Sequence, residues 1–404
     1  MPRVVSVSTV LPLGDDTTIA PLAHAHVRAG SAFTVPPSLE RYGVPPNVLR
    51  RLSRSGVLAV RAGMEALEKA GLVSAESGWM LPEALRDHVG VIFASSFGHC
   101  EAALRKDNAE DRKLALDLIL QANVQLAQLT KARAFNTFSS ASCCSTTVAI
   151  KLAANAILAE DARYMLVVAA DAILDGACEE VVSSFVRLKA ASDAAEPYGK
   201  TAFSTERNGF FFGEGAVALL LADERAPRPP AQQRSVDLVA SRIGNSAHHG
   251  TQIEHGHVRR VLEDAIDHAC KRRAVTRSAL ARHCLYVSHE TGTRLCAVAE
   301  VQALRAVFGE DARRVVITNT KSRCGHMMGA CVEDAVAVTA LLQQRAPAVD
   351  VSSLDADFAD LRFADGRSRR LDWAVHVAYG MGSQVAVCVY ALAPFDDDTK
   401  NSRP

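Results

Sequence analysis

Two adjacent cysteines, Cys143 and Cys144, stand just ahead of a segment with the pattern of an apolar helix. In the stretch TFSSASCCSTTVAIKLA, small polar residues precede the cysteines, and the helix is expected over residues 146–160. A thiol at the N-terminal end of a helix lies near the positive end of the helix dipole, which lowers the pKa of the thiol and favours the nucleophilic thiolate. Neighbouring side chains point in different directions, so only one thiol can face a given carbon atom. Position alone leaves open whether either cysteine is a nucleophile or both are small buried side chains.

Two histidines and a lysine follow strand-like runs further along the chain. His289 ends the run in CLYVSHETGT, whereas Lys321 and His326 follow the run in VVITNTKSRCGHMMGA. Open α/β sheets bind ligands at the carboxyl ends of their strands, which is where these side chains are expected. One histidine in such a place is usually a structural group. Two histidines with a lysine and a cysteine at the start of a helix indicate a reactive site.

A glycine-rich segment near the C-terminus, HVAYGMGSQVA, separates two apolar runs at Gly380 and Gly382. Glycine allows the backbone to approach a substrate closely, and a free N–H group in such a turn can stabilise an oxyanion. A tight hairpin explains the same glycines when the segment is considered by itself.

Short β-branched runs alternate with helical patterns along the whole chain, which predicts an α/β protein with largely buried mixed sheets. The runs are residues 88–96, 164–172, 216–222, 235–244, 284–289, 314–320 and 373–392. The Pro/Arg-rich stretch DERAPRPPAQQRS divides the chain, and we expect one half over residues 1–234 and another over residues 235–404. Both sides carry the same alternation, which hints at a duplicated βα unit.

Composition excludes several classes of protein. The 404 residues include 45 Lys plus Arg and 45 Asp plus Glu, which gives no general electrostatic reason to bind nucleic acid or an anionic membrane. The apolar runs are too short to span a bilayer and the N-terminus lacks the pattern of a signal peptide, so a cytoplasmic protein is expected. The ten cysteines form no CxxC pair and no compact His/Cys cluster, so neither a disulfide framework nor a metal site is expected.

The order of these motifs resembles that of the β-ketoacyl synthases of the elongating, malonyl-using type. The resemblance runs from residue 50 to residue 390 and includes the cysteine before a helix, FSTERNGFFFGEGAVALLL, HETGT, NTKSRCGH and the C-terminal glycine-rich turn. Each motif is weak by itself. Their occurrence in the family's order is highly specific.

The resemblance implies a fold and a set of catalytic roles. Members of that family have the thiolase fold, in which two duplicated βα halves pack in a five-layered α/β/α/β/α arrangement, and they work as dimers. Cys143 matches the nucleophile that accepts the acyl group, and Cys144 is the residue after it. His289 and His326 match the histidines that activate malonyl decarboxylation and stabilise the enolate, and Lys321 matches the lysine that supports the second histidine.

The implied chemistry is decarboxylative condensation of a carrier-bound acyl chain with malonyl-acyl carrier protein. A thiolate accepts an acyl group from a thioester readily, and imidazole N–H donors stabilise the charge that forms when carbon dioxide leaves. No metal and no bound cofactor are expected, because 4′-phosphopantetheine arrives on the carrier protein. The oxyanion hole would use the N–H groups of Cys143 and Met381, the latter flanked by Gly380 and Gly382.

Further residues match the family's substrate pocket and its surface for carrier protein. The implied pocket residues are Phe185, Phe210, Tyr379, Thr291, Thr293 and Glu290. The implied docking residues are Arg50, Arg51 and Lys189. Carrier proteins are acidic, so a small basic patch suits them, although a solvated helix face explains each basic residue equally well.

The chain departs from the family pattern at several positions, which indicates a specialised member. Met381 replaces the gate phenylalanine. Glu290 replaces the glycine after the first histidine, so its carboxylate is expected either beside the site or in water. Ala335 replaces an acidic residue near the lysine, and Glu333 and Asp334 are the candidates to substitute for it.

Three alternatives remain open beside a condensing enzyme of a specialised type II polyketide, polyene or fatty-acid-like pathway. An acyltransferase would pass the acyl group from Cys143 to an alcohol or amine without malonyl decarboxylation. A non-catalytic partner of a heterodimer, like a chain-length factor, would usually lack the nucleophile. A degradative thiolase is disfavoured because Cys388 lies inside the final strand and not in the glycine-rich turn. The sequence does not distinguish a homodimer from a heterodimer with a related ketosynthase.

Overall fold

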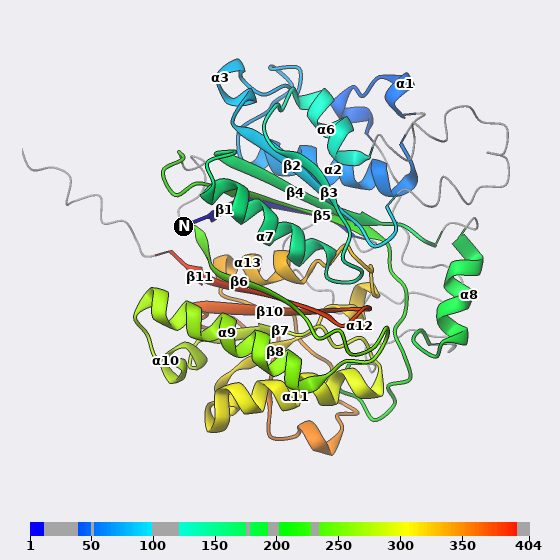
Figure 1. Cartoon of the computed structure of the whole chain (residues 1–404), viewed down its shortest axis with the longest axis vertical. Helices are drawn as coiled ribbons and strands as arrows, with labels where there is room; N and C mark the ends of the chain where they lie inside the picture. The colour runs from blue at the N-terminus through cyan, green and yellow to red at the C-terminus, as the bar shows by residue number, and fades with distance from the viewer. Residues whose placement is uncertain are drawn as a thin grey trace, which may run out of the picture.

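The computed structural model of the protein describes residues 1–11, 39–49, 52–98, 121–174, 178–192, 202–227 and 234–393. Figure 1 shows five stacked layers: helices, strands, helices, strands and helices. The two outer helical layers contain α2 (Arg54–Lys69) with α6 (Ala122–Thr130) on one side, and α9 (His255–Arg273), α10 (Arg277–Ala281) and α11 (Arg294–Phe308) on the other. The middle layer contains α7 (Ser145–Leu158) and α13 (Glu333–Gln343). The predicted five-layered thiolase-like arrangement is therefore confirmed.

The strands form two half-sheets with the same design. The first has the order β3-β2-β4-β5-β1 and the second the order β6-β11-β10-β7-β8-β9. In the first, β3, β2 and β4 are parallel, and β5 and β1 then run antiparallel to their neighbours. In the second, β9, β8, β7 and β10 are parallel, and β11 and β6 are antiparallel to their neighbours. This repetition agrees with a duplicated βα unit.

The strand bounds are as follows. The first half-sheet contains β1 (Arg3–Val10), β2 (Val89–Ala94), β3 (Asn136–Ser139), β4 (Tyr164–Asp171) and β5 (Gly215–Ala222). The second contains β6 (Val236–Asn245), β7 (Cys284–Val287), β8 (Val316–Thr318), β9 (Arg362–Phe363), β10 (Trp373–Gly380) and β11 (Gln384–Leu392). Short helices α1 (Pro46–Leu49), α3 (Glu83–Arg86) and α12 (Lys321–Cys324) and the longer α8 (Glu179–Arg187) complete the assigned α-helices of the described residues.

Strand β1 joins the two half-sheets. It pairs along its length with β5, but it meets β6 only at Arg3 opposite Asp237 and Val4 opposite Val236. The sequence analysis did not predict β1, β3 or β9. The last two are short, with four and two residues, so they give little periodic signal. The division between residues 234 and 235 stays a prediction.

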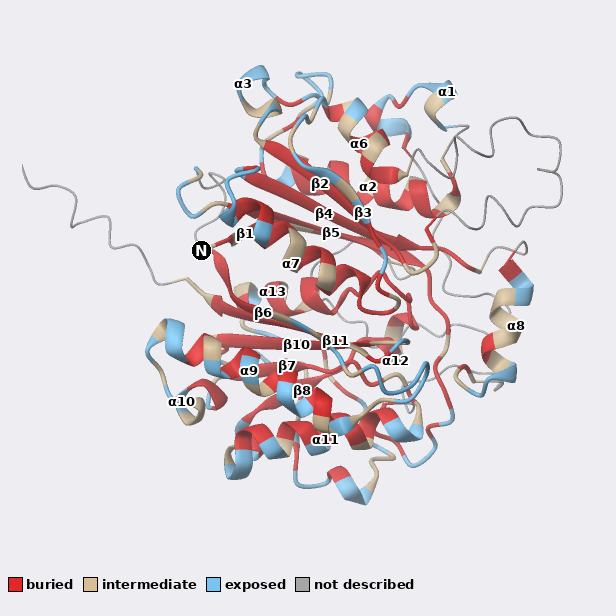
Figure 2. Cartoon of the chain, viewed as in Figure 1, coloured by how far each residue is buried: buried red, intermediate tan, exposed pale blue. Residues whose placement is uncertain are grey.

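The middle helices are buried between both half-sheets, and this determines their composition. Figure 2 shows α7 and α13 largely buried, whereas the outer helices carry an exposed face. Small residues such as Ala149, Ala153 and Ala337 are fully buried in the main apolar core, which lets the helix backbone pack closely on the strands. The helix predicted over residues 146–160 is confirmed as α7, shifted by one residue at its start and two at its end.

No helix within the described ranges is long and apolar enough to cross a lipid bilayer.

Candidate active site

Cys143 lies in a tight turn between β3 and α7. The residue before it, Ser142, has a φ of 52°, in the left-handed region that non-glycine residues seldom adopt. The turn is held by the N–H of Cys144, which donates to the carbonyl of Ala141 at 3.0 Å, and by the N–H of Ala141, which donates to Ser145 Oγ at 2.9 Å. Cys144 occupies the N-cap position of α7, so Cys143 precedes the helix as predicted.

The structure distinguishes the two thiols. Cys143 Sγ lies 3.2 Å from His326 Nε2. Cys144 is fully buried and packs with Ala378 and Ala386 of the hairpin formed by β10 and β11. Only Cys143 therefore meets a histidine that can exchange a proton with it.

His326 is fixed by its backbone. Its N–H donates to the carbonyl of Phe211 at 2.6 Å, and its carbonyl accepts from the N–H of Gly213 at 3.1 Å. A Cβ atom on Gly213 would lie 2.1 Å from the carbonyl oxygen of Cys324, so this close approach of two backbones requires glycine. The imidazole is thus presented to Cys143 by a pair of closely packed loops.

His289 completes a compact group. It follows β7, and its ring centroid lies 5.6 Å from that of His326, with the ring planes at 86°. Tyr379, at the end of β10, contacts the other side of His289 at a centroid distance of 5.1 Å. The two histidines predicted at the carboxyl ends of strands thus lie together, and His326 contacts Cys143.

Both imidazoles are neutral. Burial, reinforced by the charge of Lys321, lowers the pKa of His326 to about 3 and lowers that of His289 well below its usual value. A neutral imidazole carries one N–H donor and one acceptor nitrogen. Two such rings side by side can donate hydrogen bonds to an oxyanion or receive a proton from a thiol.

The pKa of Cys143 differs from the prediction made from its position before the helix. Burial raises it to about 11, and the lowering influences of Ser142 and Lys321 are smaller. The expectation of a lowered pKa was wrong because the thiol is desolvated as well as close to a helix end. The resting group is a thiol, so its proton must leave when the sulfur attacks.

Lys321 and Glu333 form a buried ion pair beside this group. Burial alone would lower the pKa of Lys321, but Glu333 more than compensates and raises it. Burial alone would raise the pKa of Glu333, but Lys321 lowers it to about 2. Glu333 also accepts a hydrogen bond from Thr320 Oγ1 at 2.8 Å. Of the two candidates to replace the acid missing at Ala335, Glu333 is the one that pairs with the lysine.

Asp334 belongs to a different buried network. It accepts hydrogen bonds from Thr147 Oγ1 and from the Tyr390 hydroxyl, each at 2.8 Å, and it lies 3.1 Å from His376 Nδ1. These contacts connect α13 to α7 and the final hairpin. Asp334 therefore joins structural elements and does not take part in the pairing with Lys321.

The turn at residues 380–382 contacts the nucleophile turn directly. A Cβ atom on Gly380 would lie 3.0 Å from the carbonyl oxygen of Ala141 and 3.2 Å from Cys144 Sγ. Gly382 has a φ of 87°, which glycine adopts without strain. The side chain of Met381 packs against the apolar cluster that contains Cys143. The hairpin tip thus places the Met381 backbone beside the cysteine.

Two family models match the chain. The N-terminal domain of β-ketoacyl synthases matches residues 31–226, and the C-terminal domain of β-ketoacyl synthases matches residues 237–349. The chain belongs to the β-ketoacyl synthase family.

Relatives and solved structures agree with this assignment. The chloroplastic 3-oxoacyl-[acyl-carrier-protein] synthase II of Arabidopsis thaliana is 24% identical over 369 residues, which cover 86% of this chain and 65% of that protein. The chain therefore spans less than two thirds of the length of this relative. A β-ketoacyl synthase from Burkholderia phymatum STM815 has a TM-score of 0.80 at 22% identity, covering 97% of this chain and 99% of that one.

A second solved structure has the same fold. It is a type II PKS acyl-carrier protein in complex with its ketosynthase bound to the hexaketide. Its TM-score is 0.78 at 21% identity, covering 97% of this chain and 99% of that one.

An aromatic cluster borders Cys143. Phe185 of α8 packs edge-to-face on Phe210 at 5.9 Å and on Phe212 at 5.5 Å, and Phe210 contacts the His326 ring at 5.0 Å. Phe185 and Phe210 were predicted pocket residues. Phe212 and Met328, which belong to the same cluster, were missed. The run FFF at residues 210–212 could have indicated Phe212, because alternate residues of an extended segment face the same side and Phe210 was already a predicted pocket residue.

Another residue missed by the sequence analysis is Cys331. Its Sγ donates to the carbonyl of Cys143 at 2.7 Å, and its N–H donates to Thr146 Oγ1 at 3.0 Å. Cys331 thereby ties the segment after His326 to the nucleophile turn.

The loop after His289 carries three predicted pocket residues with different surroundings. Thr291 and Thr293 are half-buried, and their Oγ1 atoms lie 3.3 Å apart. Glu290 is fully buried, so the expectation that it could face water was wrong. One oxygen of its carboxyl group lies within 4.8 Å of Cys296 Sγ and of a carboxyl oxygen of Glu300, both on α11.

The predicted docking residues are only partly described. Lys189 is exposed just after the C-terminal end of α8. Arg50 and Arg51 lie outside the described residues.

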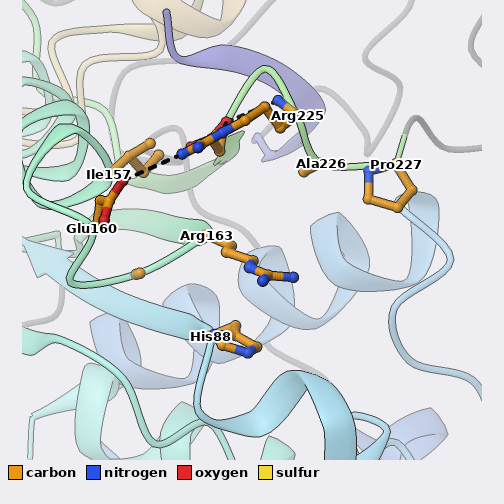
Figure 3. Close-up of a pocket in the computed structure, with 9 residues that line it drawn as sticks. His88, Ile157, Glu160, Arg163, Arg225, Ala226 and Pro227 are labelled. Carbon is orange, nitrogen blue, oxygen red and sulfur yellow. Dashed lines mark hydrogen bonds and ion pairs between the residues drawn. The ribbon is translucent and has the colours of Figure 1, made fainter.

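A cavity of about 480 Å³ lies away from this group of residues, near the amino ends of β2 and β4. His88 and Arg163 are among the residues that line it (Figure 3). Arg225, which also lines it, forms ion pairs with Glu160 and Asp223. None of the predicted catalytic residues lines it.

Proposed function

We propose that the protein catalyses the decarboxylative Claisen condensation of a carrier-bound acyl chain with malonyl-acyl carrier protein. The observation that carries this proposal is the contact of 3.2 Å between Cys143 Sγ and His326 Nε2, with neutral His289 packed against the same imidazole. A nucleophile with two neutral N–H donors fits both halves of the reaction.

In the first half-reaction, Cys143 Sγ attacks the thioester carbon of the acyl donor. The thiol proton passes to His326 Nε2 and then to the departing phosphopantetheine sulfur, so a new thioester forms on Cys143 as the old one breaks. The N–H groups of Cys143 and Met381 would stabilise the tetrahedral oxyanion. The free imidazole is neutral again at the end of this step.

In the second half-reaction, malonyl thioester loses carbon dioxide and its electron pair becomes an enolate. His289 and His326 donate N–H groups to the enolate oxygen. The enolate carbon then attacks the acyl group on Cys143, forming a carbon–carbon bond as the thioester to Cys143 breaks. The released cysteine thiolate takes up one proton from solvent. Lys321 supports this step because its charge disfavours protonation of both imidazoles.

Partners and setting form part of the same proposal. Acyl carrier protein would present both substrates on 4′-phosphopantetheine and would contact Lys189 with Arg50 and Arg51. A solved structure with the same fold, a ketosynthase in complex with its acyl-carrier protein, supports this partner. We place the reaction in a specialised polyketide or fatty-acid-like pathway in the cytoplasm, with a homodimer or a heterodimer with a related ketosynthase as the working unit.

Intact-mass measurement after incubation with acyl-carrier protein tests the first half-reaction. Wild type and Cys144→Ala should gain the acyl mass, whereas Cys143→Ala should not. Carbon dioxide release from malonyl-carrier protein tests the second half-reaction. An acylated enzyme that releases no carbon dioxide with any acyl chain would favour an acyltransferase, and acylation of Cys143→Ala would contradict the assignment of the nucleophile.

A further inference from the structure

The loop that carries His289 is held by two buried carboxyl groups. Glu300 Oε1 accepts the N–H of His289 at 3.0 Å, and Glu300 Oε2 accepts Ser288 Oγ at 3.0 Å. Glu290 Oε1 accepts the N–H of Gly292 at 2.8 Å, and the Glu290 carbonyl accepts Asn319 Nδ2 at 2.7 Å. These four hydrogen bonds determine the path of the backbone on both sides of the imidazole.

The two carboxyl groups differ in their hydrogen-bond partners. Glu300 has a donor on each oxygen, whereas Glu290 Oε2 is buried and has no hydrogen-bond partner among the described residues. The hydroxyl groups of Tyr286 and Tyr379 and the Nδ1 atom of His289 are also buried without one. A bare carboxylate oxygen in such a place costs several kcal/mol, so it favours the form that carries a proton.

Within the described part of the chain, the cations that face the two carboxyl groups are already paired. The charged and titratable groups that face the pair are Cys296 on α11, Tyr286 on β7, Tyr379 on β10, Arg207 before β5 and Lys321 on α12. Arg207 forms an ion pair with Asp355, and Lys321 with Glu333. Burial and mutual repulsion raise the pKa of Glu290, and burial raises that of Glu300 against its hydrogen-bond donors.

We propose that Glu290 is a positioning residue for His289: its carboxyl group keeps a proton beside Glu300, and this neutral form holds the loop that presents the imidazole. The inference rests on the proposed function, in which His289 donates to the enolate oxygen. Loss of the proton would place a second negative charge within 4.8 Å of Glu300. It would also add negative charge next to the residue that stabilises a developing negative charge.

The first test measures carbon dioxide release against pH, each variant being scaled to its own rate at neutral pH. The wild-type rate should fall as pH rises through about 8, the pKa of Glu290. Glu290→Gln, which cannot ionise, and Glu290→Gly, which removes the carboxyl group, should both lose this alkaline decline. Glu76→Gln changes an exposed glutamate on the surface and should keep it. An alkaline decline of the same midpoint in both Glu290 variants would overturn the proposal.

A second test does not depend on activity, so it separates failure of this inference from failure of the proposed function. Infrared difference spectra between neutral and alkaline pH should show protonated carboxyl bands in wild type and in Glu76→Gln, because burial also raises the pKa values of Asp171 and Glu300 to about 7. The band of Glu290 should be missing from Glu290→Gln. Its persistence there would overturn the proposal whether or not the wild type releases carbon dioxide.

The same variants test whether a cation occupies the cluster. We expect each of two salts, potassium chloride and magnesium chloride, to change the unfolding temperature of the wild type and of Glu290→Gln by the same amount. A saturable stabilisation by either salt that disappears in Glu290→Gln would show that the carboxyl groups bind a cation. The proposal that Glu290 keeps a proton would then be wrong.

Discussion

His289 and His326 have opposite kinds of acidic neighbourhood. Beside His326, Glu333 is paired with Lys321, and its pKa is lowered to about 2. Beside His289, Glu290 and Glu300 lie within 4.8 Å of each other, and both pKa values are raised. All three carboxyl groups are fully or almost fully buried, so burial is not the difference. A cation within contact distance makes a buried glutamate ionise. Without one, burial makes it hold its proton, and at Glu290 the second carboxyl group adds to this effect.

The strongest test of this comparison removes the cation. Lys321→Met should destabilise the protein by about 3–5 kcal/mol, because Glu333 is left as a buried unpaired charge. Glu290→Gln should cost only about 1 kcal/mol, because an amide replaces a group that is already neutral. Urea denaturation at neutral pH measures both. Adding Glu333→Gln to Lys321→Met should recover part of the loss, and equal costs for the two single variants would contradict the comparison.

The second test separates the chemical roles of the two sides. His289→Ala should lower carbon dioxide release about 10²- to 10³-fold, the usual effect of losing an oxyanion donor, and leave acylation of Cys143 largely intact. His326→Ala should lower both, because Nε2 lies 3.2 Å from the nucleophilic sulfur. Single-turnover acylation and carbon dioxide release give the two rates. Equal loss of acylation in both variants would show that His289 is needed for acylation as much as His326 is, which would contradict these separate roles.

The smallest effect is in the pH dependence of stability. Glu333 has a lowered pKa, so its contribution is present above the ordinary glutamate value and is lost as pH falls towards 2. Glu290 has a raised pKa, so its contribution is present at acid pH and is lost as pH rises through about 8. The contribution of each glutamate is the difference in unfolding free energy between wild type and its Gln variant. Across this pH range, the difference for Glu333→Gln should rise with pH, and the difference for Glu290→Gln should fall. Parallel curves for the two variants would contradict the assigned protonation states.

Much of the site could be predicted because its residues belong to motifs in a fixed order. Cys143 stands just before an apolar helix, whereas His289, Lys321 and His326 follow strand-like runs, and the order of these motifs indicates the family. The architecture follows from the same alternation of short strands and helices. The bounds of α7 were predicted within two residues because its apolar pattern is continuous.

Other features depend on burial and on contacts distant in sequence. The raised pKa of Cys143 comes from desolvation by the surrounding loops, which the helix pattern after it does not reveal. The choice of Glu333 over Asp334 depends on which side of α13 faces Lys321. The burial of Glu290 depends on how α11, which carries Glu300 ten residues further along, packs on the loop after His289. Such facts arise from packing between elements, so the local pattern of residues could not supply them.

The position of β1 has a consequence for how the chain folds. The residues of β1 are made more than 200 residues before their partners in β5 and β6. This inner strand of the joined sheet must therefore keep its hydrogen-bonding edges unpaired until those partners have been made. Pairings of such long range slow folding and expose unpaired edges to other chains. Deleting residues 3–10 should therefore cause aggregation of the newly made chain and not a local loss of stability at the N-terminus.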